Sequence, residues 1–145
     1  MGKFIKYIFI LIIVAVIGIQ FIKVEKTNPP VTGDIKAPAE VKNIFRNACY
    51  DCHSNETEWP WYSSVAPISW FIEDDVRDGR KHLNFSEWET YKDTRKTKKR
   101  EEIWDEVNEG SMPLKMYTYL HPKSNLDFNQ KSIIKEWATK KKAWE

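Results

Sequence analysis

Five consecutive residues, Cys49-Tyr50-Asp51-Cys52-His53, form the pattern with the clearest chemistry in the sequence. This C-x-x-C-H arrangement is the attachment signal of c-type haem. Each of two thiols separated by two residues can add across one vinyl group of the same haem, and an adjacent histidine can reach the iron. The motif therefore predicts one covalently attached haem c, with Cys49 and Cys52 as attachment residues and His53 as the proximal ligand of the iron.

Three other interpretations of the two cysteines are weaker. A thioredoxin-like redox pair follows a strand in a βαβ unit, and no segment here alternates with period two for long enough to form a strand. A structural zinc site needs a second pair of ligands, whereas only the widely separated His82 and His121 remain. A disulfide between Cys49 and Cys52 suits an oxidising compartment but explains neither the spacing nor His53.

The sixth coordination position of the iron has four candidate ligands, which are His82, Met112, Met116 and His121. A thioether donor raises the reduction potential and suits an iron that carries electrons without rebuilding its ligand shell. Of the two methionines we predict Met112, because it follows the expected helix end at Gly110 and precedes the last helix. A local shift of the chain would select Met116 instead. A protein with this ligand set is expected to carry electrons and not to act as an enzyme, so we expect no catalytic residue. An open or labile sixth position would fit a haem-based peroxidase or gas sensor.

The N-terminal segment Phe4–Ile22 is apolar except for Lys6 and Gln20. As a helix it reaches roughly 28 Å, which is enough to span a bilayer. A cleaved signal peptide is the alternative, but no small-residue cleavage site ends the apolar run. Lys3 and Lys6 favour a cytoplasmic N-terminus. We therefore expect a single-pass anchor in the cytoplasmic (inner) membrane, contacting lipid through residues 4–22, with the following domain on the periplasmic or extracytoplasmic side.

Composition divides the chain into three parts. Residues 1–23 form the anchor, residues 24–37 form an extended linker that contains Pro29 and Pro30, and residues 38–145 form the haem-binding domain. The length of the last part suits one compact domain.

The net charge excludes one class of partner. Lys3, Lys6, Lys23 and Lys26 against Glu25 account for more than the whole formal net charge of +2, so the rest of the chain is close to neutral. A nucleic-acid binder needs a clear basic excess to contact phosphates. We therefore expect no nucleic-acid partner.

Apolar residues at helical spacing predict an all-α domain. Gly79 is expected to stop the second of its helices, and Asp127 with Gln130 has the spacing of a capping box. The faces expected to be buried are Val41, Ile44, Phe45 and Ala48 in a helix from Pro38; Ile68, Phe71, Ile72 and Val76 in a helix from about Pro67 to Asp78; Trp88 and Tyr91 in a helix capped by Ser86 and Glu89; Ile103, Trp104 and Val107 in a helix that ends at Gly110; and Ile133, Ile134 and Trp137 in the last helix.

Three further features each allow a functional and a structural interpretation. The basic stripe Lys92–Arg100 either docks an acidic redox partner or is a solvated helix face. His121 is either a hydrogen-bond donor to a haem propionate or an alternative iron ligand, or else an ordinary loop residue before Pro122. Four aromatic side chains either wall the haem or belong to the core: Trp59, Trp61, Tyr62 and Trp70.

A longer pattern of residues resembles a bacterial haem-binding domain family of membrane-anchored or secreted cytochromes. It covers roughly Val41 to Trp137, and no departure from the family pattern is visible. The resembling segments are Cys49–Asn55, Trp59–Tyr62, Ala66-Pro67, Asp75-Val76, Gly79-Arg80, Asn84–Trp88, Met112–Leu114, Tyr117 and His121-Pro122.

The loop around Ser111-Met112-Pro113 also resembles the ligand loop of small c-type cytochromes. This second resemblance implies a cytochrome c-like helical domain, in which the helix before the motif (residues 38–48) packs against a C-terminal helix (residues 128–144). It implies haem attachment outside the cytoplasm. Together the two resemblances imply covalent binding of one haem and electron transfer at the membrane surface, with a redox partner protein that the sequence does not identify.

Overall fold

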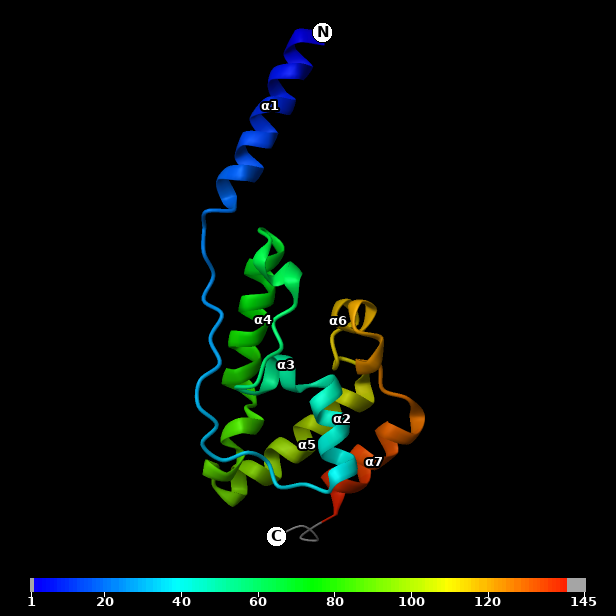
Figure 1. Ribbon diagram of the computed structural model, residues 1–145. Helices are drawn as coiled ribbons and strands as arrows, with labels where there is room; N and C mark the ends of the chain where they lie inside the picture. The colour runs from blue at the N-terminus through cyan, green and yellow to red at the C-terminus, as the bar shows by residue number, and fades with distance from the viewer. Residues whose placement is uncertain (1, 141–145) are drawn as a thin grey trace.

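The computed structural model describes residues 2–140, and its secondary structure there is helical, without a strand. This confirms the expected all-α class behind an N-terminal apolar helix (Figure 1). The elements are α1 (Gly2–Ile19), α2 (Ala39–Ala48), α3 (Tyr50–His53), η1 (Trp61–Ser64), α4 (Ile68–His82), η2 (Phe85–Thr90), α5 (Asp93–Glu109), α6 (Lys115–Leu120), η3 (Pro122–Ser124) and α7 (Phe128–Thr139), where η marks a 3-10 helix.

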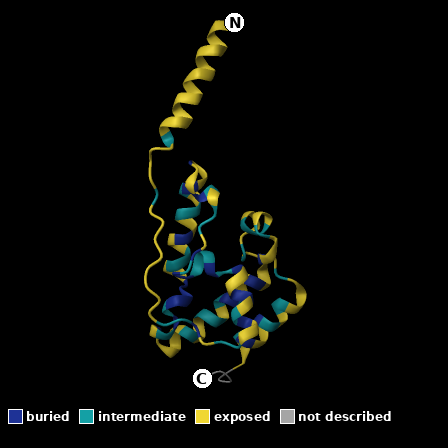
Figure 2. Cartoon of the chain, in the orientation of Figure 1, coloured by how far each residue is buried: buried dark blue, intermediate teal, exposed yellow. Residues whose placement is uncertain are grey.

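Helix α1 projects from the rest of the chain and buries none of its residues (Figures 1 and 2). It is long and apolar enough to cross a membrane, and it lies near the N-terminus, where a signal sequence has the same properties. A helix that is apolar on all faces and has no protein neighbours needs an apolar environment other than this domain.

The expected linker is extended, and it lies along the domain instead of hanging free. The amide of Gly33 donates to the carbonyl of Ser86 (2.9 Å), and that of Ile35 donates to the carbonyl of Phe85 (3.0 Å). The side chain of Ile35 is part of the buried core. The segment before α2 is therefore bound to the folded domain at several points.

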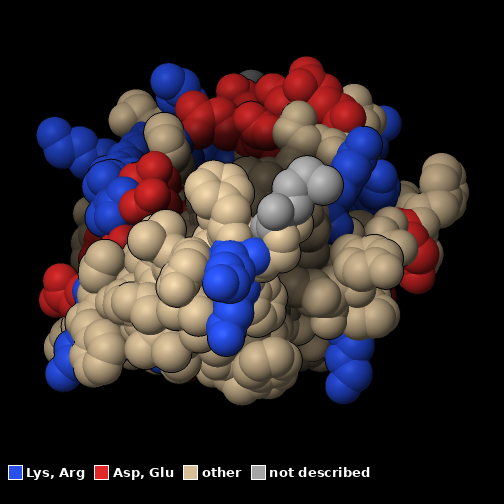
Figure 3. Space-filling view, turned by 90° about the horizontal axis from the view of Figure 1, so that it is seen from above, with Lys and Arg blue, Asp and Glu red and all other residues tan. Residues whose placement is uncertain are grey.

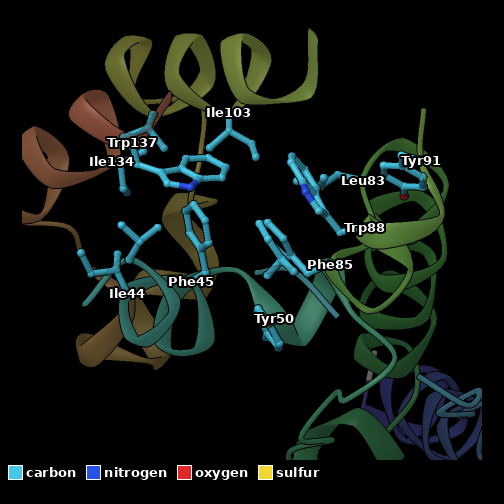
Figure 4. Packing of buried hydrophobic residues seen from close by; sticks show 13 residues of the cluster. Ile44, Phe45, Tyr50, Leu83, Phe85, Trp88, Tyr91, Ile103, Ile134 and Trp137 are labelled. Carbon is cyan, nitrogen blue, oxygen red and sulfur yellow. The ribbon is translucent and has the colours of Figure 1, made fainter. Parts of the chain in front are cut away.

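The core is built from aromatic side chains where α2, η2, α5 and α7 meet (Figure 4). The ring of Phe45 stacks on that of Phe85 at 4.8 Å and meets the edge of Trp137 at 5.1 Å. The predicted inner face of α2 is buried, and so are Ile134 and Trp137 of α7. Helices α2 and α7 pack together as expected.

Two helix ends follow local sequence signals. Gly110 adopts the left-handed conformation (φ 75°) that ends α5, and Asp127 with Gln130 forms the capping box that begins α7. Helix α7 ends at Thr139, and the expectation that it continues towards Trp144 lies, from residue 141 on, outside the described residues.

Other local expectations are wrong. The expected helix capped by Ser86 and Glu89 is the short 3-10 helix η2, in which Asn84 caps the amide of Ser86 (3.0 Å). On α4, Val76 is buried, but Ile68 and Phe71 are exposed although helical spacing placed them inside. The N-terminal half of α4 packs against η1 through a different side, on which Ser69 is buried, so Ile68 and Phe71 stay open to solvent.

Gly79 does not stop α4, which continues to His82. A β-carbon at this position would lie 2.6 Å from the carbonyl oxygen of Cys52 and 3.2 Å from its β-carbon. Gly79 therefore allows α4 to touch the backbone of α3, and it was mistaken for a stop signal because a close helix contact and a helix end both favour glycine.

The Gly79 contact predicts that Gly79→Ala destabilises the domain. Alanine is the better helix former by about 1 kcal/mol, yet its methyl group would collide with the backbone of Cys52, and overpacking of this kind costs about 1–3 kcal/mol. Urea unfolding followed by circular dichroism measures the net change, which we expect to be a loss. The neighbouring exposed Asp78→Ala is the control and should change stability by less than about 0.5 kcal/mol. Equal or higher stability of Gly79→Ala would show that α3 and α4 separate easily.

Candidate functional site

The C-x-x-C-H motif forms one turn at the corner between α2 and α3. Cys49 ends α2, where its amide donates to the carbonyl of Phe45 (2.8 Å). Its own carbonyl accepts hydrogen bonds from the amides of Cys52 (3.2 Å) and His53 (2.9 Å). This turn holds both thiols and the imidazole on one short segment, and the two cysteines are free thiols.

Burial controls the protonation of both thiols. Loss of solvent raises the pKa of Cys49 to about 12, with a smaller contribution from the neighbouring Cys52. The pKa of Cys52 also rises to about 12, first through burial and then through the carboxylates of Asp75 and Asp51. A redox-active dithiol pair has the opposite character, because its nucleophilic thiol has a lowered pKa. The surroundings therefore do not suit a thioredoxin-like function.

His53 is oriented by the backbone of α4. Its Nδ1 atom lies 3.0 Å from the carbonyl oxygen of Gly79 and 3.2 Å from that of Leu83. Carbonyl oxygens only accept hydrogen bonds, so Nδ1 carries the proton and Nε2 keeps its lone pair. Burial lowers the pKa of His53, which favours the neutral ring. Metal-binding histidines are commonly fixed by such a hydrogen bond from the other ring nitrogen.

The four candidates for the sixth iron position lie in different settings. Met112 is half-buried in the loop after α5, where its amide donates to the carbonyl of Glu106 (3.1 Å). Met116, on α6, is 76% exposed, and His82 is exposed at the end of α4. His121 follows α6, and its Nε2 atom lies 3.2 Å from the hydroxyl of Tyr62.

A polar network joins the segment around α6 to the motif. The hydroxyl of Tyr117 donates to Asp51, which lies between the two cysteines (2.6 Å). The ring of His121 lies 4.3 Å from that of Tyr117 and contacts Tyr62 of η1. The Met112 loop leads directly into this helix, so the network ties a candidate ligand segment to α3. Tyr117 belongs to the segments that carry the family resemblance, but no pattern in the sequence pairs it with Asp51.

Arg80 is a second residue whose role the sequence left open. Its guanidinium donates to the carbonyl of Ser54 (2.7 Å), directly after the motif, and to the hydroxyl of Thr57 (2.8 Å). It also reaches the carbonyl of Thr27 (2.8 Å) and the side-chain oxygen of Asn28 (3.0 Å) in the linker. Arg80 therefore holds the end of the motif and the linker against α4.

Large apolar side chains are exposed on both sides of α3. Helical spacing places Ile72 and Phe71 on the same face of α4 as Gly79, and Phe71 is 67% exposed. Leu114, directly before α6, and Met116, within α6, are exposed as well. Figure 1 shows α4 and α6 rising on either side of α3. Exposed apolar groups on neighbouring elements are typical of a surface that contacts another molecule.

These features fit a haem. The donor set consists of two free thiols and a histidine whose Nε2 is available, and apolar side chains flank it, as a macrocycle requires. Of the four aromatic residues considered as haem wall or core, none is in the buried core: Trp59, Tyr62 and Trp70 are half-buried and Trp61 is exposed. Among residues 2–140, no group of three or more His, Cys, Asp or Glu side chains is arranged to hold a metal ion.

Comparison with known proteins gives one match. A family model described as a haem-binding domain matches residues 14–140, which include the motif, the Met112 loop and α7. No match was found among curated proteins or among solved structures. Because the matched segment covers most of the chain and contains the site described above, the chain belongs to the haem-binding domain family.

Proposed function

We propose that this haem-binding protein is a membrane-anchored c-type cytochrome that carries electrons through one haem. Cys49 and Cys52 attach the haem, His53 is the proximal ligand and Met112 the distal one. The observation that carries the proposal is the position of His53, whose Nδ1 is held by the carbonyls of Gly79 in α4 and of Leu83 directly after it, while two free thiols lie on the same turn. A bound haem c supplies a reversible one-electron couple at its iron.

The protein's own residues keep this site ready for binding. The carbonyls of Gly79 and Leu83 fix the ring of His53 and its tautomer, so no rearrangement is needed before Nε2 binds. The bond between Tyr117 and Asp51 ties α6 to α3 and so limits movement of the segment that begins at Met112. A site that is fixed in this way suits electron transfer, which proceeds best when the ligands of the metal do not move.

The alternative function is a haem-based peroxidase or gas sensor with an open or labile sixth position. His121 favours this alternative, since its buried Nδ1 atom has no hydrogen-bond partner among the described residues and its ring contacts that of Tyr117 at a tilted angle. A peroxidase or sensor uses such polar groups near an open iron. The Met112 experiment below separates the two functions.

The location proposed for the domain is the periplasmic or extracytoplasmic side of the inner membrane, with α1 as a single-pass anchor. Lys3 and Lys6 support this orientation, because cytoplasmic ends of membrane helices are rich in Lys and Arg. The redox partner is a protein, and the basic stripe Lys92–Arg100, which occupies the N-terminal half of α5, is a candidate surface for an acidic one. No nucleic acid takes part.

Covalent attachment predicts that haem resists extraction. In the unmodified protein, acid and organic solvent should leave the haem on the chain, because thioether bonds survive this treatment. The double variant Cys49→Ser/Cys52→Ser should release all of its haem, whereas each single variant keeps one thioether bond and should retain it. Absorption of the separated protein measures the result. Haem that remained bound to the double variant would rule out attachment at these cysteines.

Ligation by Met112 predicts a spectral signature. The oxidised protein should show the weak charge-transfer band at about 695 nm that accompanies sulfur ligation of haem iron. Met112→Ala should abolish this band, lower the reduction potential and open the iron to carbon monoxide. Met116→Ala is the matched control, because Met116 is largely exposed, and it should preserve the band. Loss of the band in Met116→Ala but not in Met112→Ala would show that Met116 is the ligand. Absence of the band in the unmodified protein would favour the sensor or peroxidase function.

A further inference from the structure

We propose that the tip of the domain, formed by η1 and the beginning of α4 (residues 61–68), docks on the surface of the lipid bilayer into which α1 inserts. A contact between Gln20 and Ala66 holds it there. This inference rests on the proposed role of α1 as a membrane anchor. It adds a second membrane contact, made by the folded haem domain itself.

The contact between Gln20 and Ala66 sets the height of the tip. The side-chain amide of Gln20 donates to the carbonyl of Ala66 (3.0 Å), and the amide of Ala66 donates to the side-chain oxygen of Gln20 (3.0 Å). Gln20 lies within the apolar segment, which continues through Phe21 and Ile22. Ala66 therefore lies at the level of the last turn of this segment, where a membrane anchor leaves the hydrocarbon region.

A second hydrogen bond lies close to the first. The ammonium group of Lys26 donates to the hydroxyl of Ser64 (2.6 Å), two residues before Ala66. Two residues of the chain that follows α1 thus bind two residues of the tip. Figure 1 shows the beginning of α4 directed towards α1, with α7 and the core at the other end of the domain.

The composition of the tip suits a lipid surface. Residues 59–72 contain no Lys, Arg, Asp or Glu. Three large apolar residues here are open to solvent: Trp61 is 81% exposed, Ile68 48% and Val65 39%. Tryptophan is enriched at the level of the lipid headgroups, where its ring is partly in apolar surroundings and its N–H group reaches water.

The surface at this end of the molecule agrees with the composition. Figure 3 views this end of the molecule from above, with α1 towards the reader, so the uncharged area near its centre includes the side chains of α1 itself, and most of the charged residues lie around the edge. The uncharged residues 59–72, with the exposed Trp61, are bound to the end of α1 through Gln20 and so continue the apolar surface of that helix. The bilayer is therefore the occupant that the position and the chemistry of the tip favour.

Fluorine NMR of the full-length protein in lipid vesicles tests the proposal. Tryptophans are replaced by 5-fluorotryptophan, and the Trp61 resonance is assigned through Trp61→Phe. Vesicles contain a lipid whose headgroup carries gadolinium or, as the diamagnetic control, lutetium. Gadolinium should remove the Trp61 resonance and spare those of Trp88 and Trp137, which lie in the core at the far end (Figure 4).

Flotation after an alkaline wash separates this proposal from that of the anchor. A protein that floats with the vesicles while its Trp61 resonance survives gadolinium is anchored but not docked, which overturns the inference alone. A protein that does not float overturns both the anchor and the docking. Gln20→Leu keeps the segment apolar but removes both bonds to Ala66, so it should restore the Trp61 resonance. If gadolinium still removes the Trp61 resonance in Gln20→Leu, the role given to Gln20 is overturned.

Discussion

The close contact between α3 and α4 is the constraint on which the site depends. Only a glycine at position 79 lets the backbone of α4 approach Cys52 this closely. The same approach brings the carbonyls of Gly79 and Leu83 within hydrogen-bond distance of His53. A wider separation of the two helices would leave Nδ1 of this half-buried ring without a partner, and a polar group that loses its partner where water cannot reach it costs about 1–3 kcal/mol. One missing side chain therefore determines both the packing of α4 and the orientation of the candidate iron ligand.

Much of the fold could be predicted because its signals are local. The buried face of α2, the left-handed Gly110 and the capping box at Asp127 each depend on residues within about one or two helical turns. The errors have a different origin. Gly79 does not end the helix as expected, because the group that requires a glycine at this position, the backbone of Cys52, lies far away in the sequence. Phe71 was expected to be buried because an apolar stripe predicts a partner surface without telling whether that partner is the protein itself.

The candidate site also consists of a part with local sequence signals and a part without them. Cys49, Cys52 and His53 could be identified from five adjacent letters, since their chemistry is set by spacing within one turn. The pairs that surround them join residues far apart in the chain, such as Tyr117 with Asp51 and Tyr62 with His121. A single sequence contains no signal for such pairs. Arg80 belongs to the same class, because its four acceptors come from the linker and from the segment after the motif.

The bound linker has a consequence for how the domain meets other proteins. A flexible chain of residues 24–37 would have an end-to-end distance of about 20 Å, so a tethered domain would sweep a large volume and turn freely. Here Arg80 holds Thr27 and Asn28, and the backbone of Gly33 and Ile35 is bound further along. With α1 as the proposed membrane anchor, the domain therefore stays close to the bilayer in one orientation, and a partner protein can approach it from only part of the surrounding space.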